Sequence, residues 1–343
     1  MKSHVNITIF IPHLGCPNQC VFCNQRSITG KADFDSDSVI DIIEEALLTI
    51  SSDTEAEIAF FGGSFTGIDY ELMCRLLEIA YSYVKSGRVK SIRCSTRPDY
   101  INEKILDTLA RYGVKVIELG LQSISDDVLL ETKRGHTFFA EEQAVKLIKE
   151  KGFSLVGQMM IGLPGSTLEK EIKTAEFISA SGADSARVYP TVVFKETELC
   201  EMAARGYYEP LTLEDAVNRT AEVLKVFYNS GVKVIRVGLC ASENLSSHDA
   251  YYAGPNHSAL GELCENRVFY TIIYEKIKSM CLQEKASVKV RVPQGALSKA
   301  IGQKKQNKLR LISDFSLSEI CFVEDDTLFG YEVECEERKL KCI

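Results

Sequence analysis

The chain has 343 residues, a net charge of −8 and twelve cysteines. This length allows one large α/β core with a small appended unit. A hydrophobic content of 45% and a charged content of 26% exclude global disorder and fibrous architectures. The chain contains no run of about 18 apolar residues and no secretory signal, so we expect a cytoplasmic protein without a membrane segment. In that reducing compartment the cysteines are thiols, metal ligands or catalysts rather than disulfides.

Up to about residue 240, short β-rich runs alternate with amphipathic helical stretches. The expected strands are 5–11, 57–61, 89–95, 115–119, 154–160, 184–189 and 233–237, and the expected helices are 38–50, 69–84, 102–112, 141–151, 167–180 and 213–229. Strict alternation predicts parallel strands joined by right-handed crossovers. We therefore predict an α/β fold, a partial (β/α)6-type TIM barrel at residues 1–240. Its chemistry should collect in the loops that follow the strands.

Beyond residue 240 the pattern changes. We expect a connector with a helix at 268–280 (residues 241–284), followed by a small α+β domain at residues 285–343. The elements expected in that domain are strands at 288–292, 319–323 and 328–333 and helices at 296–301 and 306–313. Residues 285–310 contain eight lysines and arginines and no acidic residue, so the rest of the chain carries a net charge of −16. The C-terminal domain is therefore a basic unit on an acidic protein.

Three cysteines, Cys16, Cys20 and Cys23, follow the first expected strand. Three thiolates on one short loop can ligate three irons of a [4Fe–4S] cluster and leave the fourth iron open for a substrate or cofactor. A structural zinc site is the alternative, and it needs a fourth protein ligand. The sequence offers no second closely spaced pair, although a lone cysteine or His13 would serve. The other nine cysteines show no ligand spacing, and an auxiliary cluster assembled from them by folding remains open.

The motif CPNQCVFC at 16–23 resembles the cluster loop of the radical S-adenosylmethionine (radical SAM) superfamily. Further motifs fall at or just after strand ends, namely FFGGSF at 60–65, CSTRPD at 94–99, ELGLQS at 118–123, RGHT at 134–137, QMMIGLPG at 158–165 and VYPT at 188–191. Their serial order is similar to that of the Elongator catalytic-subunit family and, more loosely, of oxygen-independent coproporphyrinogen oxidase. The resemblance covers about residues 5–210.

The resemblance implies a [4Fe–4S] cluster and S-adenosylmethionine as cofactors. Reductive cleavage of S-adenosylmethionine then yields methionine and a 5′-deoxyadenosyl radical, which removes hydrogen from the substrate. The family uses the loop of Gly62, Gly63 and Ser64 for the methionine amino group, and Ser64 stands where many members have glutamate. An electron donor such as flavodoxin or ferredoxin is the implied protein partner.

Five further residues take candidate roles by position in these motifs. Gln122 and Gln158 are expected to bind the hydroxyls of the adenosyl group, and Glu118 is expected to orient the site from its strand end. Arg97 and Tyr189 are the candidate catalytic residues, and the guanidinium fork of Arg97 suits the cofactor carboxylate.

Some features depart from the resemblance or stand beside it. The Elongator catalytic subunit has a longer, differently spaced cysteine loop and a C-terminal acetyltransferase domain, and we expect no such domain here. Wobble-uridine carboxymethylation by the acetyl-CoA route is therefore not expected. His136 of the RGHT motif is more often a structural histidine than a proton donor.

The basic segment at 292–307 resembles a KH module of the kind found in bacterial transcription elongation factors. Such modules clamp a nucleic-acid backbone with a glycine-flanked loop between two helices. Here Lys305 replaces the second glycine, and Lys304, Lys305 and Lys308 are the candidate nucleic-acid contacts. The alternative is a degenerate KH-like fold kept for packing, or a solvated charged face.

Three functions follow from these patterns. The first is a radical SAM enzyme that modifies RNA, with tRNA as the example, and docks it through the C-terminal unit. The second is the same radical chemistry on a small molecule or a protein. The third is a non-enzymatic protein that binds zinc and RNA. The number of motifs at strand ends favours an enzyme.

Overall fold

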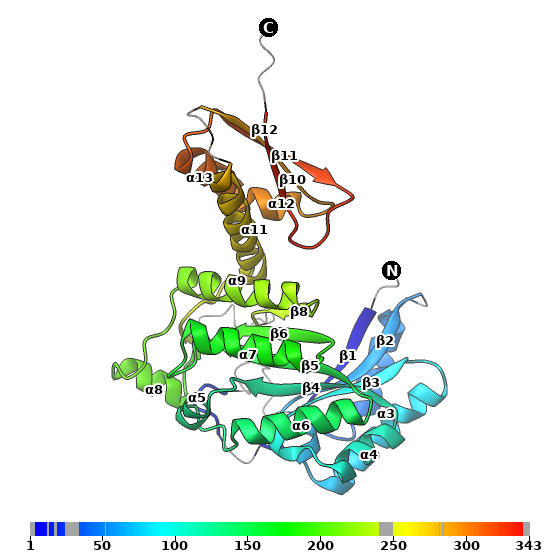
Figure 1. Ribbon diagram of the computed structural model, residues 1–343. Helices are drawn as coiled ribbons and strands as arrows, with labels where there is room; N and C mark the ends of the chain where they lie inside the picture. The colour runs from blue at the N-terminus through cyan, green and yellow to red at the C-terminus, as the bar shows by residue number, and fades with distance from the viewer. Residues whose placement is uncertain are drawn as a thin grey trace. The chain divides into compact units, whose positions relative to one another are not determined.

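The computed structural model describes residues 4–11, 14–16, 19–24, 34–51, 53–239, 250–280, 282 and 285–338. The chain divides into two compact units, one within residues 1–211 and 232–256 and the other within residues 212–231 and 257–343 (Figure 1). This division differs from the expected boundaries at 240 and 285. Helix α9 (Leu213–Asn229) packs against α11 (Leu260–Ser279) and so belongs to the second unit.

The first unit is built on a parallel seven-stranded sheet of order β1-β2-β3-β4-β5-β6-β8. Its strands are β1 (His4–Ile11), β2 (Glu55–Gly62), β3 (Ser91–Thr96), β4 (Val114–Gln122), β5 (Ser154–Ile161), β6 (Ser185–Pro190) and β8 (Lys233–Val237). Because the order follows the sequence and neighbouring strands are parallel, the sheet is the curled half-barrel that the βα alternation predicts, and that prediction is confirmed.

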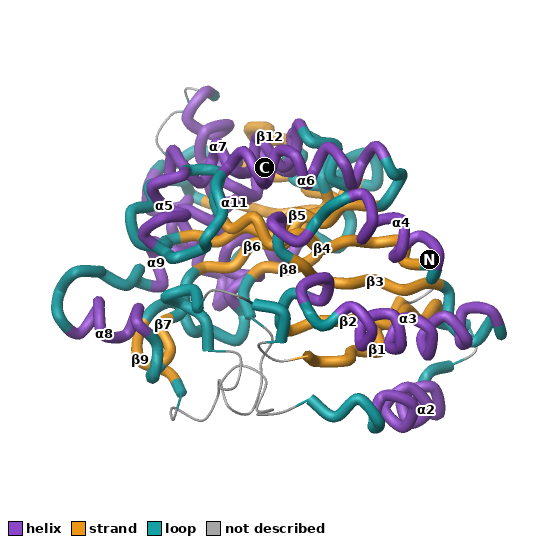
Figure 2. Tube along the Cα trace, turned by 90° about the horizontal axis from the view of Figure 1, so that it is seen from below, coloured by secondary structure: helices purple, strands orange, loops and turns teal. Residues whose placement is uncertain are grey.

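Helices join successive strands of this unit. They are α2 (Val39–Thr49), α3 (Tyr70–Lys85), α4 (Glu103–Arg111), α6 (Phe138–Glu150) and α7 (Leu168–Ala180), with the shorter α5 (Asp126–Glu131) and α8 (Glu198–Ala204). Two 3₁₀ turns, η1 (Phe65–Gly67) and η2 (Pro98–Tyr100), and a small pair of strands, β7 (Val193–Phe194) and β9 (Tyr251–Ala253), complete it. Figure 2 shows α6 and α7 covering one side of the sheet.

The two faces of the sheet differ in polarity, as the alternation along β6 shows. Ala186 and Val188 are fully buried, whereas Arg187 and Tyr189 between and after them are only partly buried. Successive strand side chains point to opposite faces, so the apolar set faces the helices and the polar set faces the concave side. The concave side is therefore where a polar site is built.

In the second unit a three-stranded sheet has the order β11-β10-β12, where β10 (Ser287–Pro293) is parallel to β11 (Glu319–Asp325) and antiparallel to β12 (Glu334–Glu337). Helices α12 (Leu297–Ile301) and α13 (Gln306–Asp314), with the turn η3 (Gln303–Lys305) between them, connect β10 to β11. The core is apolar and includes Val288, Val290, Leu311 and Ile320.

The last strand lies elsewhere than the sequence predicts. Residues 328–333 form a loop with a turn at 330–331, where Gly330 has φ 59°, and the strand is the acidic stretch Glu334–Glu337. Ion pairs from Lys289 to Glu336 and from Arg291 to Glu334 join it to β10. Cross-strand charge pairs thus stabilise a strand whose glutamates have low β propensity, and a propensity argument misses it.

Candidate active site

The cysteine loop follows β1 and packs against the loop that follows β2. The backbone N–H of Gly63 donates to the carbonyl of Ile11 (2.8 Å), and that of Ser64 donates to the carbonyl of Leu14 (3.2 Å). A Cβ atom on Gly63 would lie 2.1 Å from the Leu14 oxygen. The lack of a side chain therefore allows two backbones to touch, which positions the cysteines. We expected these glycines beside the cofactor, and the described contact is with the cysteine loop itself.

Ser64 is fully buried and connects the ends of β2 and β3. Its Oγ lies 3.0 Å from Thr96 Oγ1 and accepts a hydrogen bond from the backbone N–H of Arg97 (3.3 Å). Thr66 Oγ1 is also hydrogen-bonded to Thr96. A glutamate at this position would add a charge to a buried hydroxyl network, so serine fits the packing here. A contact between Ser64 and the cofactor stays a prediction.

Two arginines lie beside the buried Cys20. Arg134 Nη1 is 3.4 Å from the Cys20 sulfur, and Arg97 Nη1 is 3.9 Å from it. Arg97 also donates through Nε and Nη2 to the Asp99 carboxylate (2.9 Å each), and Arg134 donates to the carbonyl of Gly120 (2.6 Å). These contacts hold both guanidiniums in place beside the Cys20 sulfur. The bidentate partner of Arg97 is thus Asp99, and its pairing with a cofactor carboxylate stays a prediction.

Cys16 experiences the same cations from farther away. Burial raises the pKa of its thiol, whereas a hydrogen bond from the Ser64 backbone and the charges of Arg97 and Arg134 lower it. The net effect is a raised pKa of the Cys16 thiol, so without bound iron this thiol stays protonated. Iron binding would release that proton, because a thiolate is the ligand.

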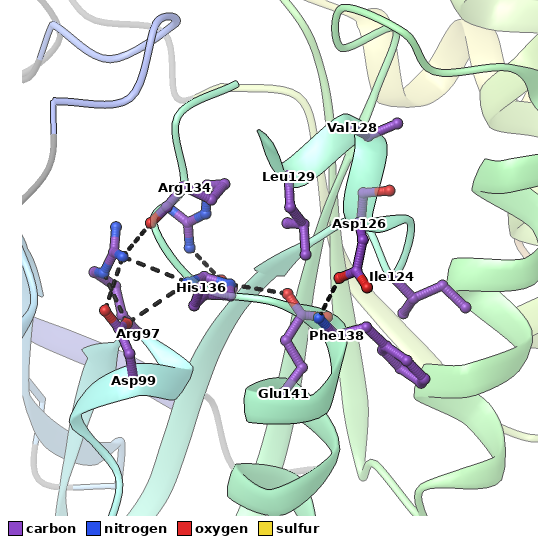
Figure 3. Close-up of polar contacts among 12 residues, drawn as sticks. Arg97, Asp99, Ile124, Asp126, Val128, Leu129, Arg134, His136, Phe138 and Glu141 are labelled. Carbon is purple, nitrogen blue, oxygen red and sulfur yellow. Dashed lines mark hydrogen bonds and ion pairs between the residues drawn. The ribbon is translucent and has the colours of Figure 1, made fainter. Parts of the chain in front are cut away.

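His136 lies behind the two arginines, as Figure 3 shows, with only 1% of its side chain exposed. Its Nε2 is 3.0 Å from Glu141 Oε1, and its Nδ1 is 3.6 Å from Asp99 Oδ1. Burial, and then the charge of Arg134, lowers the pKa of His136 to about 3. Burial raises the pKa of Glu141. His136 is therefore a neutral, hydrogen-bonded histidine that supports the arginines, in line with a structural role.

Alternating charges cross the concave face of the sheet. Arg93 on β3 donates to Glu57 on β2 (3.0 Å) and to Glu118 on β4 (3.0 Å), and Arg187 on β6 donates to Glu118 (3.0 Å). Gln158 on β5 also donates to Glu118 (3.1 Å). Glu118 is 1% exposed and sits at the centre of this chain, so it positions both arginines and Gln158. The expected role of Glu118 in orienting the site stays a prediction.

The remaining candidates lie on the same face or at its edge. Gln122 ends β4 with φ 73°, after a bulge in its pairing with β5. Tyr189 on β6 accepts a hydrogen bond from Arg187 (3.3 Å). The structure thus brings Glu118, Gln158 and Tyr189 into one network. It places Arg97 in a separate cluster beside Cys20.

Several residues of these clusters were missed by sequence reasoning: Glu57, Arg93, Asp99, Arg134, Glu141 and Arg187. For Arg93 and Arg187 a usable signal existed, because each is the only charged residue of its strand. Glu141 gave none, since a glutamate in the first turn of a helix is usually solvated.

A cavity of about 1120 Å³ opens beside the cysteine loop. The residues that line it include Cys20, Cys23, His136, Leu130 on α5 and Glu198 on α8. The cavity gives the buried Cys20 a route to the space in which a cluster would be assembled.

The three cysteines fit an iron–sulfur cluster better than a single metal ion. Within the described ranges, no three Cys, His, Asp or Glu side chains converge closely enough to hold one ion. A cubane cluster needs one thiolate at each of three separate corners, so it does not require such convergence. The two guanidiniums beside Cys20 complement the anionic charge that thiolates bring to a cluster. The nine described cysteines are all free thiols, and Cys240, Cys281 and Cys342 lie outside the described residues.

Comparison with known families agrees with this donor set. A model of the Radical SAM superfamily matches residues 10–178, and a model of the Radical_SAM C-terminal domain matches residues 183–269. The chain belongs to the radical SAM superfamily. Radical SAM proteins use a [4Fe–4S] cluster and S-adenosylmethionine, and the chain is accordingly an enzyme. No helix that the structure describes combines the length and apolar character needed to cross a bilayer.

Curated relatives resemble part of the chain. Elongator complex protein 3 of Homo sapiens is 35% identical over 149 residues, which is 43% of this chain and 27% of that protein. The tRNA uridine(34) acetyltransferase of Methanocaldococcus infernus is 35% identical over 181 residues, or 47% of this chain and 34% of that protein. The chain thus spans about a third or less of these relatives' length.

Solved structures share the fold. The archaeal Methanocaldococcus infernus Elp3 with an N-terminal deletion aligns with a TM-score of 0.62 at 21% identity, covering 83% of this chain and 65% of that one. Streptococcus suis SuiB bound to S-adenosylmethionine aligns with a TM-score of 0.51 at 14% identity, covering 72% and 53%. At these identities the likeness concerns the fold alone.

Proposed function

We propose that this radical SAM enzyme modifies RNA, with a tRNA-like substrate. The observation that carries the chemistry is the loop of three cysteines beside Arg97 and Arg134. The relatives named for tRNA uridine modification, together with the basic C-terminal unit, support the RNA substrate. The cellular setting is the cytoplasm, with flavodoxin or ferredoxin as electron donor.

Cys16, Cys20 and Cys23 would hold three irons of the cluster, and the fourth iron would bind S-adenosylmethionine. When bound, these groups supply one-electron reduction and cleavage of S-adenosylmethionine to methionine and a 5′-deoxyadenosyl radical. Arg97 and Arg134 lie against the sulfur of Cys20 and keep this side chain oriented. The concave network around Glu118 presents Gln158 for the adenosyl hydroxyls and keeps water from the reacting groups.

The C-terminal unit presents the loop that would contact RNA. Gly302, Lys304 and Lys305 all have positive φ (78°, 51° and 62°), and both lysines are exposed. Asn307 is buried and donates to the carbonyl of Asn266 (2.8 Å), which anchors the start of α13 behind this loop. Two consecutive non-glycine residues with left-handed backbone cost stability, and such strain is often retained for function. We infer that Lys304, Lys305 and Lys308 contact phosphates.

The enzymatic part is tested by anaerobic reconstitution with iron and sulfide, followed by reduction in the presence of S-adenosylmethionine. We expect 5′-deoxyadenosine and methionine from the wild-type protein and neither from Cys20→Ala. Cys74→Ala, which removes a half-buried thiol on α3, should retain the products. Failure of the wild-type protein to form 5′-deoxyadenosine would contradict the proposal.

RNA docking is tested with the double variant K304Q/K305Q. We expect weaker tRNA binding and a plot of log K against log salt that is shallower by about one to two units. The control K276Q/K278Q removes two exposed charges from α11 in the same unit and should bind as the wild type does. Equal tRNA affinity of both variants would favour the second candidate function, the same radical chemistry on a small molecule or protein.

A further inference from the structure

Two arginines of neighbouring strands lie side by side on the concave face of the first unit. Arg187 on β6 pairs in register with Arg236 on β8. The preceding pair is Ala186 with Val234, so β8 carries one extra residue, Ile235, between its two paired positions. Without this bulge, Ile235 would occupy the place beside Arg187. Bulges commonly re-aim a side chain next to a functional site, and this one turns Arg236 toward Arg187.

The curvature of the sheet places Arg187 inside the half-barrel. Its guanidinium carbon is 5.4 Å from the ring centroid of Phe61 on β2, although β3, β4 and β5 lie between β2 and β6 in the sheet. Such a contact is possible only if both side chains point into the hollow of the curled sheet. The space in front of Arg187 is therefore the interior that radical chemistry requires to be kept from water.

The charges around Arg187 do not balance. Glu57, Arg93, Glu118 and Arg187 form an alternating chain in which two carboxylates offset two guanidiniums. Arg236 stands beside the end of this chain, and no carboxylate in the part of the molecule that the structure describes lies within ion-pair distance of it. Among the described residues, this end of the interior therefore holds one more guanidinium than carboxylate. An excess charge in a partly desolvated site attracts an anion.

A hydroxyl group completes the arrangement. Tyr189 follows Arg187 by two residues on β6, so the two side chains lie on the same face of the sheet. It accepts a hydrogen bond from Arg187 Nη1 (3.3 Å), so its own O–H is left to donate. The charge of Arg236 also acts on this hydroxyl, which places the three groups together.

We propose that Arg187, Arg236 and Tyr189 form a binding site for an oxyanion, a carboxylate or phosphate group, of the molecule from which the radical removes hydrogen. The proposal rests on the proposed function, because it assigns the interior of the half-barrel to the substrate. Glu118 already pairs with Nε and Nη2 of Arg187, so the paired N–H donors for an oxyanion are those of Arg236. Nη1 of Arg187 and the O–H of Tyr189 add single donors beside them. Phe61 supplies an apolar wall beside them.

The site is tested on the reconstituted full-length protein with two probes, inorganic pyrophosphate and malonate, by the rise in anaerobic melting temperature across a titration. We expect at least one probe to stabilise the wild type and to bind R236Q about tenfold more weakly. The affinity of Arg236→Lys for the probe should lie between those of the wild type and R236Q, because lysine keeps the positive charge and lacks the paired N–H donors of the guanidinium. R111Q, which removes an exposed arginine of α4, should bind as the wild type does.

Pyrophosphate represents a phosphate group of the substrate, and malonate represents a carboxylate group. The probe whose binding is weakened by R236Q therefore identifies which of the two groups the site binds. Equal shifts in wild type, R236Q and R111Q would show a general salt effect and overturn the site. Competition by S-adenosylmethionine, together with weaker S-adenosylmethionine binding to R236Q, would also overturn it, because the oxyanion would then be that of the cofactor. R111Q should still form 5′-deoxyadenosine without substrate. Loss of that product in the wild type contradicts the proposed function, while the anion titration is read independently.

Discussion

Replacing Glu141 by glutamine should change how the stability of the first unit depends on pH. The side chains of His136 and Glu141 are 1% and 0% exposed, and their Nε2 and Oε1 atoms are 3.0 Å apart. Burial, followed by the charge of Arg134, lowers the pKa of His136 to about 3, and burial raises the pKa of Glu141 well above 4.5. In the folded protein His136 is therefore neutral above about pH 3, and the raised pKa of Glu141 favours its protonated, neutral form.

The two groups oppose each other in the pH dependence of folding. In the unfolded chain, His136 binds a proton below about pH 6.5, and Glu141 loses one above about pH 4.5. Because the folded pKa of His136 is lowered, its contribution to stability is lost as the pH falls below 6.5. Because the folded pKa of Glu141 is raised, its contribution is lost as the pH rises above 4.5. Between these values both states of the pair bind one proton, so the two slopes cancel in the wild-type protein.

Each uncompensated proton changes the free energy of unfolding by about 1.4 kcal/mol per pH unit. In E141Q only the slope of His136 remains. From about pH 7 to about pH 5, the stability of E141Q relative to the wild type should therefore fall by about 2–3 kcal/mol. H136Q leaves only the slope of Glu141, and its relative stability should rise by about 2 kcal/mol over the same interval. The change in relative stability over this pH interval must therefore have opposite signs in E141Q and H136Q.

Urea unfolding of the cluster-free protein at three pH values, followed by circular dichroism, gives these differences. Glu150→Gln, which replaces an exposed carboxylate on the same helix, should show no such pH dependence. Relative stabilities that change in the same direction for E141Q and H136Q, or by less than about 0.5 kcal/mol in both, would refute the neutral pair.

Three further predictions concern other parts of the molecule. Gly63→Ala, whose Cβ would lie 2.1 Å from a backbone oxygen of the cysteine loop, should lose most bound iron after reconstitution. Gly152→Ala, where the new Cβ meets nothing within 4 Å, should keep the iron and lose about 1 kcal/mol of stability through its positive φ. Arg134→Met should shift the cluster's midpoint potential to a more negative value, because it removes a positive charge 3.4 Å from the Cys20 sulfur. A redox titration followed by EPR measures the potential. An unchanged potential would contradict this prediction. Thr212→Ala should lower the free energy of unfolding of the second unit by about 1 kcal/mol in thermal or urea melts. The Thr212 Oγ1 atom caps the N-terminus of α9 by accepting a hydrogen bond from the backbone N–H of Asp215 (3.1 Å).

The strand-end motifs were predictable because parallel strands place their C-terminal ends along one edge. The seven expected strands of the first unit all occur, and CPNQCVFC at 16–23 follows the first of them. The helix expected at 213–229 also occurs, and the Thr212 hydroxyl caps its first turn by accepting a hydrogen bond from the backbone N–H of Asp215. Local chemistry was enough in these cases, since hydrophobic alternation and capping involve residues that are close in sequence.

The partners of individual side chains were beyond such reasoning, even where those partners are close in sequence. Arg97 belongs to a motif whose expected partner is a carboxylate of the cofactor, yet its fork binds Asp99 two residues away. Glu141 looks solvated in the sequence and is fully buried against His136. The strand at Glu334–Glu337 exists because β10 offers it opposite charges. In each case the deciding partner is set by packing or geometry rather than by spacing.

The amino-acid sequence by itself determined the class of this protein. Twelve cysteines divide into three with cluster spacing and nine without, and a net charge of −8 contains a basic segment at 285–310. Only the tertiary structure decided what surrounds those features. The bulge at Ile235 aligns Arg236 with Arg187, and the curvature of the sheet brings Phe61 to the same place. The physical reason is that charge balance in a desolvated interior depends on which distant side chains meet there, and strand register and sheet curvature settle that.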